Sequence, residues 1–476
     1  MNNAEIIYIS SVFLSLVIAY LFFRYLYWGL KARLTYWKKI DGLSIDMLHE
    51  EAKKKSLELP FFSILVPARD EADVIACTID HLAGLNYPKD RYEIMVVTDG
   101  KELRSKEKEP AKITTQDVVE RKIREFSQLP DMPFLKHSIV PFDFDGRVGG
   151  RCTGREVPST KARALNYAIS SISKSTTICA FYDAESRPEA DCLLHVAARW
   201  LATDGKQKLW QGPVFQVRNF FQLGPLNKLI ALYQALAHEW YYPLLMRQLP
   251  FLGGTNLYVE KTLLLRIGGY DPKVLSEDLE LGVRAYMETG EWPEYIPIVS
   301  TEQTPAKYKA YFRQRLRWGS GHLQVYDKLQ NATHYPEEKR IPILRTLLWK
   351  GHAQWYFYQF MVLAPVFLLL WAWQGGILDK SAVPTDIKAM LQFLTPIYYG
   401  FTFYLFYRYC NYINFTVAPK SIAGKVFAVL QLIVLPIAGF FIALPFTTAL
   451  VLRAMNRQPQ VWVKTPRTQE VRVKAS

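Results

Sequence analysis

Residues 61–100 read FFSILVPARDEADVIACTIDHLAGLNYPKDRYEIMVVTDG, and this stretch decides the fold. Phe61–Val66 is a short apolar run that predicts a strand ending at Pro67. Ala72–Leu85 predicts a helix, and Tyr92–Val97 predicts a second strand. Strands that alternate with helices are typical of an α/β domain with a mostly parallel sheet.

The same alternation continues further along the chain. Ala162–Ile172 predicts a helix and Thr177–Tyr182 predicts another strand. Asp99 comes directly after the second strand, and Asp183 comes directly after this later one. Because ligands of such sheets bind beyond the carboxyl ends of the strands, we expect both carboxylates at one edge of the sheet. The charged segment Lys101–Arg124 is interpreted as a surface insertion.

Apolar residues gather at the two ends of the 476-residue chain, half of which is hydrophobic. Ile6–Phe23 is uncharged and long enough to cross a bilayer. Basic residues follow it, so the positive-inside tendency places the central block in the cytosol. The net charge of +14 is compatible with attraction to anionic lipids and with binding of an anionic donor substrate. No nucleic-acid-binding module is recognised, and the five cysteines lack CxxC spacing, which favours reduced thiols.

The C-terminal third carries further apolar segments at Trp355–Trp373, Leu391–Phe406 and Val426–Leu452. Trp and Tyr cluster at their edges, as they do in interfacial belts. The last run contains two prolines, so it is either one tilted span or a span followed by an interfacial helix. We therefore expect about three or four membrane segments in the whole chain. The tail is basic and is expected to stay in the cytosol.

An acidic triplet, Asp183-Ala184-Glu185, lies at the mouth of the later strand. Two carboxylates around a small residue can hold a hard divalent cation, which neutralises a diphosphate. A solvated acidic turn explains the same pattern, so both interpretations stay open.

Ser276-Glu277-Asp278-Leu279 begins a predicted helix. Serine is a common helix cap, and acidic residues in a first turn suit the helix dipole. The alternative is catalytic: Asp278, beside Glu277, takes a proton from an acceptor hydroxyl as a general base.

Gln314-Arg315-Leu316-Arg317-Trp318 lies in a segment with helical periodicity. Its aromatic stripe and basic surroundings predict an amphipathic helix on the membrane surface. Gln314, Arg317 and Trp318 share a face of that helix. An amide, a guanidinium and an indole together suit a sugar diphosphate.

Three further stretches have either a structural or a binding interpretation. Gly253-Gly254-Thr255-Asn256 is a turn, or a place where backbone approaches an acceptor sugar. Lys161 is a solvated lysine or a phosphate ligand. Pro67-Ala68-Arg69-Asp70-Glu71 is a plain turn or a resting place for a nucleoside.

Together, and in this order, the motifs from Ser63 to Trp318 resemble the membrane-bound family 2 inverting glycosyltransferases, such as the synthases of cellulose, hyaluronan and poly-N-acetylglucosamine. The resemblance implies a GT-A (Rossmann-like) fold flanked by N- and C-terminal transmembrane helices. It also implies a role for each motif. Asp99 and Glu71 would bind the nucleoside, and Lys161 would lie near the diphosphate. Asp183 and Glu185 would hold Mg²⁺ or Mn²⁺, and Asp278 beside Glu277 would be the base. The acceptor and diphosphate site would be lined by Gly254, Gln314, Arg317 and Trp318.

Two departures from the family pattern bear on function. Thr98 stands where relatives often have a second aspartate, and the triplet ends in Glu185 where Asp is commoner. The number of membrane segments is low for a polysaccharide channel, which disfavours processive synthesis.

The expected organisation is a membrane anchor (1–40), a cytosolic catalytic domain (55–303), interfacial helices (304–350), a C-terminal membrane region (351–455) and a basic tail (456–476).

Three functions are therefore weighed. The first is transfer of a hexose or N-acetylhexosamine from a nucleotide sugar, such as a UDP-sugar, to a growing β-glycan at the membrane. The second is a single transfer to a lipid-linked acceptor, and the third is a non-catalytic scaffold for envelope assembly. Intact carboxylates at all three acidic positions disfavour the scaffold. A transporter is excluded because the apolar segments form no matching halves.

Overall fold

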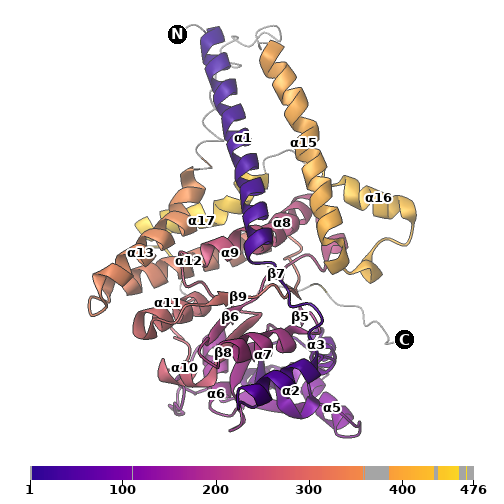
Figure 1. Cartoon of the computed structure of the whole chain (residues 1–476), viewed down its shortest axis with the longest axis vertical. Helices are drawn as coiled ribbons and strands as arrows, with labels where there is room; N and C mark the ends of the chain where they lie inside the picture. The colour runs from indigo at the N-terminus through magenta and orange to yellow at the C-terminus, as the bar shows by residue number, and fades with distance from the viewer. Residues whose placement is uncertain are drawn as a thin grey trace.

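The computed structural model describes residues 3–109, 111–357, 359, 385–433, 438–459 and 468. Its lower part in Figure 1 is a mixed α/β domain, and two long helices rise above it. The main sheet has the order β3-β2-β1-β4-β8-β6-β9. Its first four strands are parallel, and β8 is antiparallel to both of its neighbours. The strands are β1 (Phe62–Pro67), β2 (Tyr92–Asp99), β3 (Phe134–Val140), β4 (Ile178–Phe181), β6 (Leu209–Gln211), β8 (Leu257–Glu260) and β9 (Glu294–Tyr295).

Alternating side chains of the strands reach two separate cores, one on each face of the sheet. Ile64 and Val66 of β1 pack into one core, and Leu65 packs into the other. This alternation is the period of two that a strand imposes on its side chains. The first core also receives α2 (Ile45–Lys54), α3 (Ile75–Ala83), α5 (Thr115–Phe126) and α7 (Cys192–Ala202), and the second receives α6 (Lys161–Ile169), α10 (Lys261–Arg266) and α11 (Glu277–Thr289).

The prediction of a surface insertion at Lys101–Arg124 is wrong. Residues 101–124 form α4 (Lys101–Lys108) and most of α5. Thr114 and Asp117 form a capping box that begins α5, and its Val118 and Val119 are buried in the core. Most charged residues of α5 are exposed, although Lys122 is buried, and this exposed charge is why the composition alone suggested a surface segment.

A second, small sheet begins just after the acidic triplet. It has the order β5-β10-β7, formed by Arg187–Pro188, Ser300–Thr301 and Val214–Phe215. Above it lies a helical layer (Figure 1). The layer consists of α8 (Pro225–Leu236), the π-helical turn η3 (Ala237–Tyr241), α9 (Tyr242–Leu245), α12 (Tyr308–Asn331), α13 (Glu337–Leu348), the π-helical turn η4 (Trp349–Ala353), α16 (Ile422–Leu430) and α17 (Ala438–Ala454).

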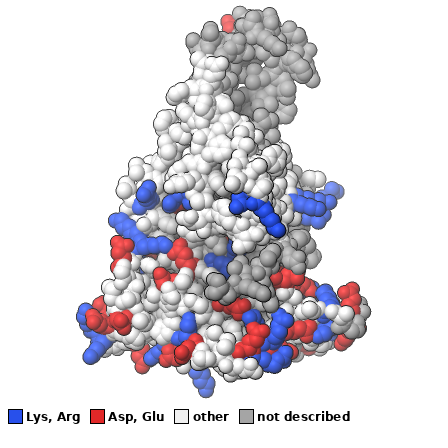
Figure 2. Space-filling view, turned by 90° about the vertical axis from the view of Figure 1, so that its right-hand side faces the viewer, with Lys and Arg blue, Asp and Glu red and all other residues white. Residues whose placement is uncertain are grey.

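Helices α1 (Asn3–Thr35) and α15 (Thr385–Tyr409) extend away from the helical layer. Among the described residues, Tyr8–Thr35 is the one helix that is long and apolar enough to cross a membrane. On the face that Figure 2 shows, the described surface of the column formed by these helices is almost free of charged side chains, whereas many Lys, Arg, Asp and Glu residues lie on the broad base.

The three apolar segments predicted in the C-terminal third differ in how they appear in the structure. Leu391–Phe406 lies within α15, and most of Trp355–Trp373 lies outside the described residues. Most of the described part of Val426–Leu452 falls in two shorter helices, α16 and α17. Helix α17 packs along α12, where a Cβ on Gly319 would stand 3.1 Å from the Cβ of Ala449.

Candidate active site

The two predicted strand-end carboxylates lie at the same edge of the sheet. Asp99 is the last residue of β2, and Asp183 comes two residues after β4 ends. Both side chains line a cavity of about 920 Å³ between the sheet and the helical layer. The parallel order β2-β1-β4 produces this juxtaposition, because it brings the carboxyl ends of the strands together.

Asp99 is held by a buried arginine that the sequence reasoning missed. Arg163 Nη1 donates to Asp99 Oδ2 at 3.3 Å, and its Nε donates to the Phe144 carbonyl at 2.9 Å. The backbone N–H of Lys101 donates to the other Asp99 oxygen at 3.0 Å. Glu71 lines the same part of the cavity. Arg163 lies two residues after Lys161, at the start of the predicted helix Ala162–Ile172, and this closeness to a candidate site residue was the available signal.

Lys161 is the first residue of α6 and reaches across the cavity. Its Nζ donates to Asp183 Oδ1 and, at 2.5 Å, to the carbonyl oxygen of Gly254. Burial by itself would lower the pKa of Lys161, but the negative charges of Asp183 and Glu277 outweigh it and raise the pKa. The ammonium group is therefore firmly charged at neutral pH.

Glu277 and Asp278 begin α11 and face the same cavity. Burial, followed by repulsion from Asp278, raises the pKa of Glu277 to about 7. Burial also raises the pKa of Asp278, although the backbone N–H of Leu279 donates to its carboxylate at 2.8 Å. Two neighbouring carboxyl groups with raised pKa values in a cavity are typical of acid–base sites.

Ser276 does not act as the side-chain cap that the sequence allowed. It occupies the N-cap position without a capping hydrogen bond. Its hydroxyl instead donates to the carbonyl oxygen of Trp318 at 3.4 Å. On the same helix, α12, a Cβ on Gly321 would stand 2.2 Å from the Ser276 hydroxyl. Helix α12 is thus packed closely against the turn that presents Asp278.

Gln314, Arg317 and Trp318 of α12 all line the cavity, as does Gly254. Arg315, one of the basic residues around the predicted aromatic stripe, is buried, with only 4% of it exposed. Its guanidinium carbon lies 3.8 Å from the centre of the Trp318 ring, and its Nη2 donates to Gln216 Oε1 at 2.6 Å.

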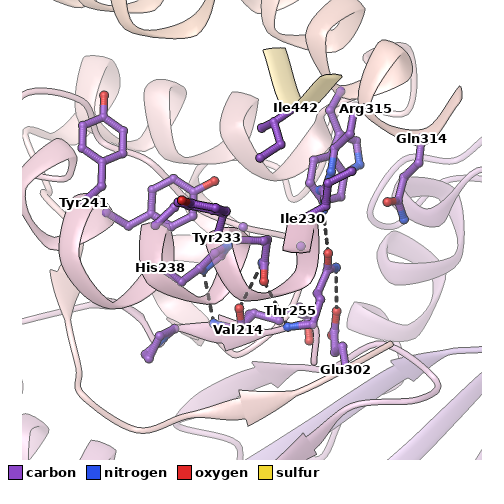
Figure 3. A pocket seen from close by; sticks show the side chains of 18 of the residues that line it. Val214, Ile230, Tyr233, His238, Tyr241, Thr255, Glu302, Gln314, Arg315 and Ile442 are labelled. Carbon is purple, nitrogen blue, oxygen red and sulfur yellow. Dashed lines mark hydrogen bonds between the residues drawn. The ribbon is translucent and has the colours of Figure 1, made fainter. Parts of the chain in front are cut away.

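A chain of hydrogen bonds continues from Arg315 to the acidic triplet. Gln216 Nε2 donates to Glu302 Oε2 at 3.4 Å, and the hydroxyl of Ser186 donates to Glu302 Oε1 at 2.7 Å. The backbone N–H of Asp183 donates to the Ser186 hydroxyl at 3.1 Å. Figure 3 shows Arg315 above and Glu302 below on this path. The path joins α12 to the Asp183 turn.

Glu185 is the one predicted site residue that the cavity wall does not include. It is fully buried, and its carbonyl oxygen accepts a hydrogen bond of 2.5 Å from Arg218 Nη2. Within the part of the chain that the structure describes, no group of three or more His, Cys, Asp and Glu side chains is arranged to hold a metal ion. A metal role for Asp183 and Glu185 stays a prediction.

The model of the family described as glycosyl transferase family group 2 matches residues 178–452, more than half of the chain. The chain belongs to this family. This family 2 glycosyltransferase is 29% identical over 291 residues to the probable glycosyltransferase YdaM of Bacillus subtilis. It is 24% identical over 299 residues to a beta-monoglucosyldiacylglycerol synthase of Trichormus variabilis. The matches cover 60% of this chain in both cases, and 60% and 54% of the two relatives.

A solved structure supports the fold of this glycosyltransferase. Mannosyltransferase PcManGT from Pyrobaculum calidifontis, in complex with GDP-Man and Mn²⁺, is similar over 94% of this chain and 99% of its own. The TM-score is 0.50 and the sequence identity is 18%. The expectation of a Rossmann-like α/β glycosyltransferase fold is confirmed.

Proposed function

We propose that this family 2 glycosyltransferase is an inverting, membrane-anchored enzyme that moves a hexose or N-acetylhexosamine from a nucleotide sugar, such as a UDP-sugar, to a growing β-glycan. The observation that carries the proposal is the convergence of Asp99, Asp183, Asp278 and Trp318 on one cavity. These residues come from the sheet edge, from α11 and from α12. One cavity therefore contains side chains suited to bind the nucleotide sugar, to act as the base and to stack on a sugar ring.

Asp278 is the proposed general base. The oxygen of an acceptor hydroxyl bonds to the anomeric carbon, the bond from that carbon to the diphosphate oxygen breaks, and the hydroxyl proton passes to the Asp278 carboxylate. The nucleoside diphosphate leaves with the bonding electrons. The raised pKa of Asp278 makes its carboxylate a better proton acceptor than an ordinary aspartate. Glu277 adds negative charge beside it.

The donor is proposed to lie along the sheet edge. Asp99 and Glu71 would contact the nucleoside, and the cations of Lys161 and Arg317 would contact the diphosphate. Asp183 fits a Mg²⁺ or Mn²⁺ site of the kind in which one or two carboxylates and the substrate phosphates hold the ion. When bound, such an ion neutralises charge on the departing diphosphate.

Membrane anchoring is proposed from α1 and α15. On the face that Figure 2 shows, the described part of their column carries few charged residues, and charged residues gather on the domain below. The proposed location is a cell membrane, which is the inner or plasma membrane if the protein is bacterial. The basic residues that follow Phe23 favour a cytosolic catalytic domain. The proposed division is an anchor (1–40), a catalytic domain (55–303), interfacial helices (304–350), a membrane region (351–455) and a tail (456–476).

A second candidate is one transfer to a lipid-linked acceptor. The cavity continues from Asp278 to apolar side chains of α1 and α15, including Val17, Phe22 and Phe401. An acyl chain suits such a lining. The name of the Trichormus variabilis relative, beta-monoglucosyldiacylglycerol synthase, is compatible with this candidate.

The test uses the purified full chain in nanodiscs with radiolabelled UDP-glucose, UDP-N-acetylglucosamine or GDP-mannose. A ladder of products on a gel supports glycan extension, and a single lipid-soluble product supports the second candidate. Asp278→Asn is the matched inactive control. If wild-type protein neither transfers nor releases nucleotide from any donor, the enzymatic proposal is wrong and a scaffold role becomes the better explanation.

A further inference from the structure

Arg24 is a charged residue inside the long apolar helix α1. It lies within Tyr8–Thr35, the segment that is long and apolar enough to cross a membrane. Its side chain lines the cavity, and its guanidinium carbon lies 4.1 Å from the centre of the Trp28 ring. A cation in such a helix is costly and is typical of a binding or transport function. Arg24 therefore marks this end of the cavity as a candidate binding site.

The π-helical turn η3 packs against α1 beside Arg24. The two elements cross at Gly29, where a Cβ would stand 2.7 Å from the Trp240 ring. The ring centroids of Trp28 and Tyr241 lie 4.6 Å apart, so Trp28 contacts both Tyr241 and Arg24. Turns of this kind are frequent at functional sites. The close crossing holds the Tyr241 ring next to the guanidinium.

Tyr241 carries a buried hydroxyl that the described residues leave without a hydrogen-bond partner. The side chain lines the cavity, and Figure 3 shows its hydroxyl pointing away from the strands. Burial raises the pKa of Tyr241, although the charge of Arg24 opposes the rise, so the phenol stays protonated and can donate. Because a buried hydroxyl without a partner is costly, an acceptor atom of a ligand would stabilise this arrangement.

A second cation approaches Arg24 from the turn η4. Burial lowers the pKa of Lys350, and the positive charge of Arg24 lowers it further. Like charges at short range in a partly buried place disfavour each other. An anion bound between the two groups would remove this repulsion. A guanidinium, an ammonium and a phenol thus meet where one anionic group could bind to all three.

The other charged residues of the cavity wall belong to its catalytic side. The carboxylates among the described lining residues are Glu71, Asp99, Asp183, Glu277, Asp278 and Glu302, and none of them belongs to α1, η3 or α15. Arg315 and Arg317 line the cavity from α12, where Arg315 is stacked on Trp318. These arginines are a second place for an anion, so a test must distinguish them from Arg24.

Toward the N-terminal end of α1, the cavity wall is apolar. Val17 and Phe22 of α1 face Ile397 and Phe401 of α15 across this part of the cavity. The rings of Phe22 and Phe401 are 6.3 Å apart with planes at 79°, so the two helices approach each other here. A hydrocarbon chain would pack on such a wall through the hydrophobic effect. The cationic group and the apolar wall together suit an anionic amphiphile.

We propose that Arg24, Tyr241 and Lys350 bind the phosphate of an anionic membrane lipid, with its hydrocarbon chain on the apolar wall between α1 and α15. The two cations supply charge, and the phenol donates a hydrogen bond to a phosphate oxygen. The site rests on the membrane anchoring proposed above, and it is separate from the donor residues and from Asp278. A free phosphate ion lacks the chain, and a diacylglycerol lacks the phosphate, so neither satisfies both parts of the site.

The experiment measures lipid binding to the purified full chain in detergent by native mass spectrometry. The probes are dioleoyl phosphatidylglycerol and dioleoylglycerol, and the competitors are excess inorganic phosphate and UDP with Mn²⁺. The variants are Arg24→Gln, Lys350→Gln and Tyr241→Phe, the last of which removes only the hydroxyl. Arg33→Gln is the matched control, since Arg33 is exposed on the same helix and lies outside the cavity wall.

The expected result is one strongly bound phosphatidylglycerol per chain and much weaker binding of dioleoylglycerol. Loss of a charged hydrogen bond in Arg24→Gln weakens phosphatidylglycerol binding about tenfold or more. Lys350→Gln and Tyr241→Phe weaken it about threefold, whereas Arg33→Gln keeps the wild-type affinity. Neither competitor displaces the lipid, because UDP binds on the catalytic side and free phosphate has no chain.

Three outcomes overturn the site. They are an equal loss in Arg33→Gln and Arg24→Gln, equal binding of dioleoylglycerol, and displacement of the lipid by UDP or by phosphate. Thermal unfolding shows whether each variant is folded, and Tyr241→Phe decides if Arg24→Gln is not. Turnover plays no part in this readout. A chain that selects the lipid but releases no nucleotide from any donor contradicts the proposed enzyme and supports the lipid site.

Discussion

Lys161 Nζ donates a hydrogen bond of 2.5 Å to the carbonyl oxygen of Gly254. The contact places the ammonium group between two carboxylates that are far apart in sequence. Lys161 is paired with Asp183, and a Cβ on Gly254 would stand 3.0 Å from Lys161 Nζ and 3.1 Å from Asp278 Oδ2. One cation thus links the proposed donor side of the cavity to the proposed base.

Gly254→Ala is expected to lower transfer about tenfold or more, because the new methyl group displaces Lys161, Asp278 or both. The measurement is kcat/KM for labelled donor and acceptor. Gly224→Ala is the control, since nothing lies within 4 Å of a Cβ built there. Equal activity of the two variants would show that the close approach at Gly254 has no catalytic importance.

Asp278→Asn is expected to abolish transfer while donor binding persists, because the base is needed only in the chemical step. General-base catalysis contributes about 10²–10⁴-fold, so a loss of at least that size is expected. Calorimetry with the nucleotide measures binding, and labelled product measures turnover. Near-normal turnover of Asp278→Asn would show that Asp278 is not the general base.

The pH dependence follows from the raised pKa values of Glu277 and Asp278. A base must be ionised to accept a proton, and burial raises the pKa of Asp278, so kcat/KM should fall on the acid side at a higher pH than an ordinary aspartate would give. The neighbouring Glu277, whose pKa is raised to about 7, contributes to this acid limb. The two groups titrate as a pair. Glu277→Gln removes the like charge, so the acid limb of its pH profile should move to lower pH. An acid limb at the same pH in this variant would contradict the coupling.

Removal of divalent metal by a chelator is expected to stop transfer, and added Mn²⁺ or Mg²⁺ should restore it. Calorimetric titration of Mn²⁺ in the presence of UDP gives a readout that is independent of activity. Asp183→Asn should weaken that binding more than Glu185→Gln, because Asp183 lines the cavity and Glu185 does not. Full activity in excess chelator would show that transfer does not depend on a divalent metal ion.

Arg315→Lys is expected to lower activity about tenfold, since lysine cannot both stack on Trp318 and reach Gln216 as the guanidinium does. The expected cause is a shift of the path through Glu302 to the Asp183 turn, which should appear as a higher KM for the donor. Arg313→Lys is the control, because Arg313 is exposed two residues away on the same helix. A wild-type donor KM in Arg315→Lys would show that the path does not position the site.

Much of the fold could be predicted because it follows from local patterns. The strands at Phe62–Pro67 and Ile178–Phe181 begin and end within one residue of the expected bounds. Tyr92–Asp99 is longer than expected, so Asp99 ends the strand and does not follow it. Hydrophobic runs of the right length, broken by turn residues, carry this information in the sequence itself.

The sequence by itself determined the alternation of strands and helices, and so placed Asp99 and Asp183 at one edge of a parallel sheet. Only the tertiary structure decided that Arg315 is buried, that Glu185 lies outside the cavity wall and that Ser276 bonds to Trp318. The physical reason is the range of the interactions. Strand and helix patterns arise from neighbours in the chain, whereas burial of one side chain depends on segments that fold against it from far away.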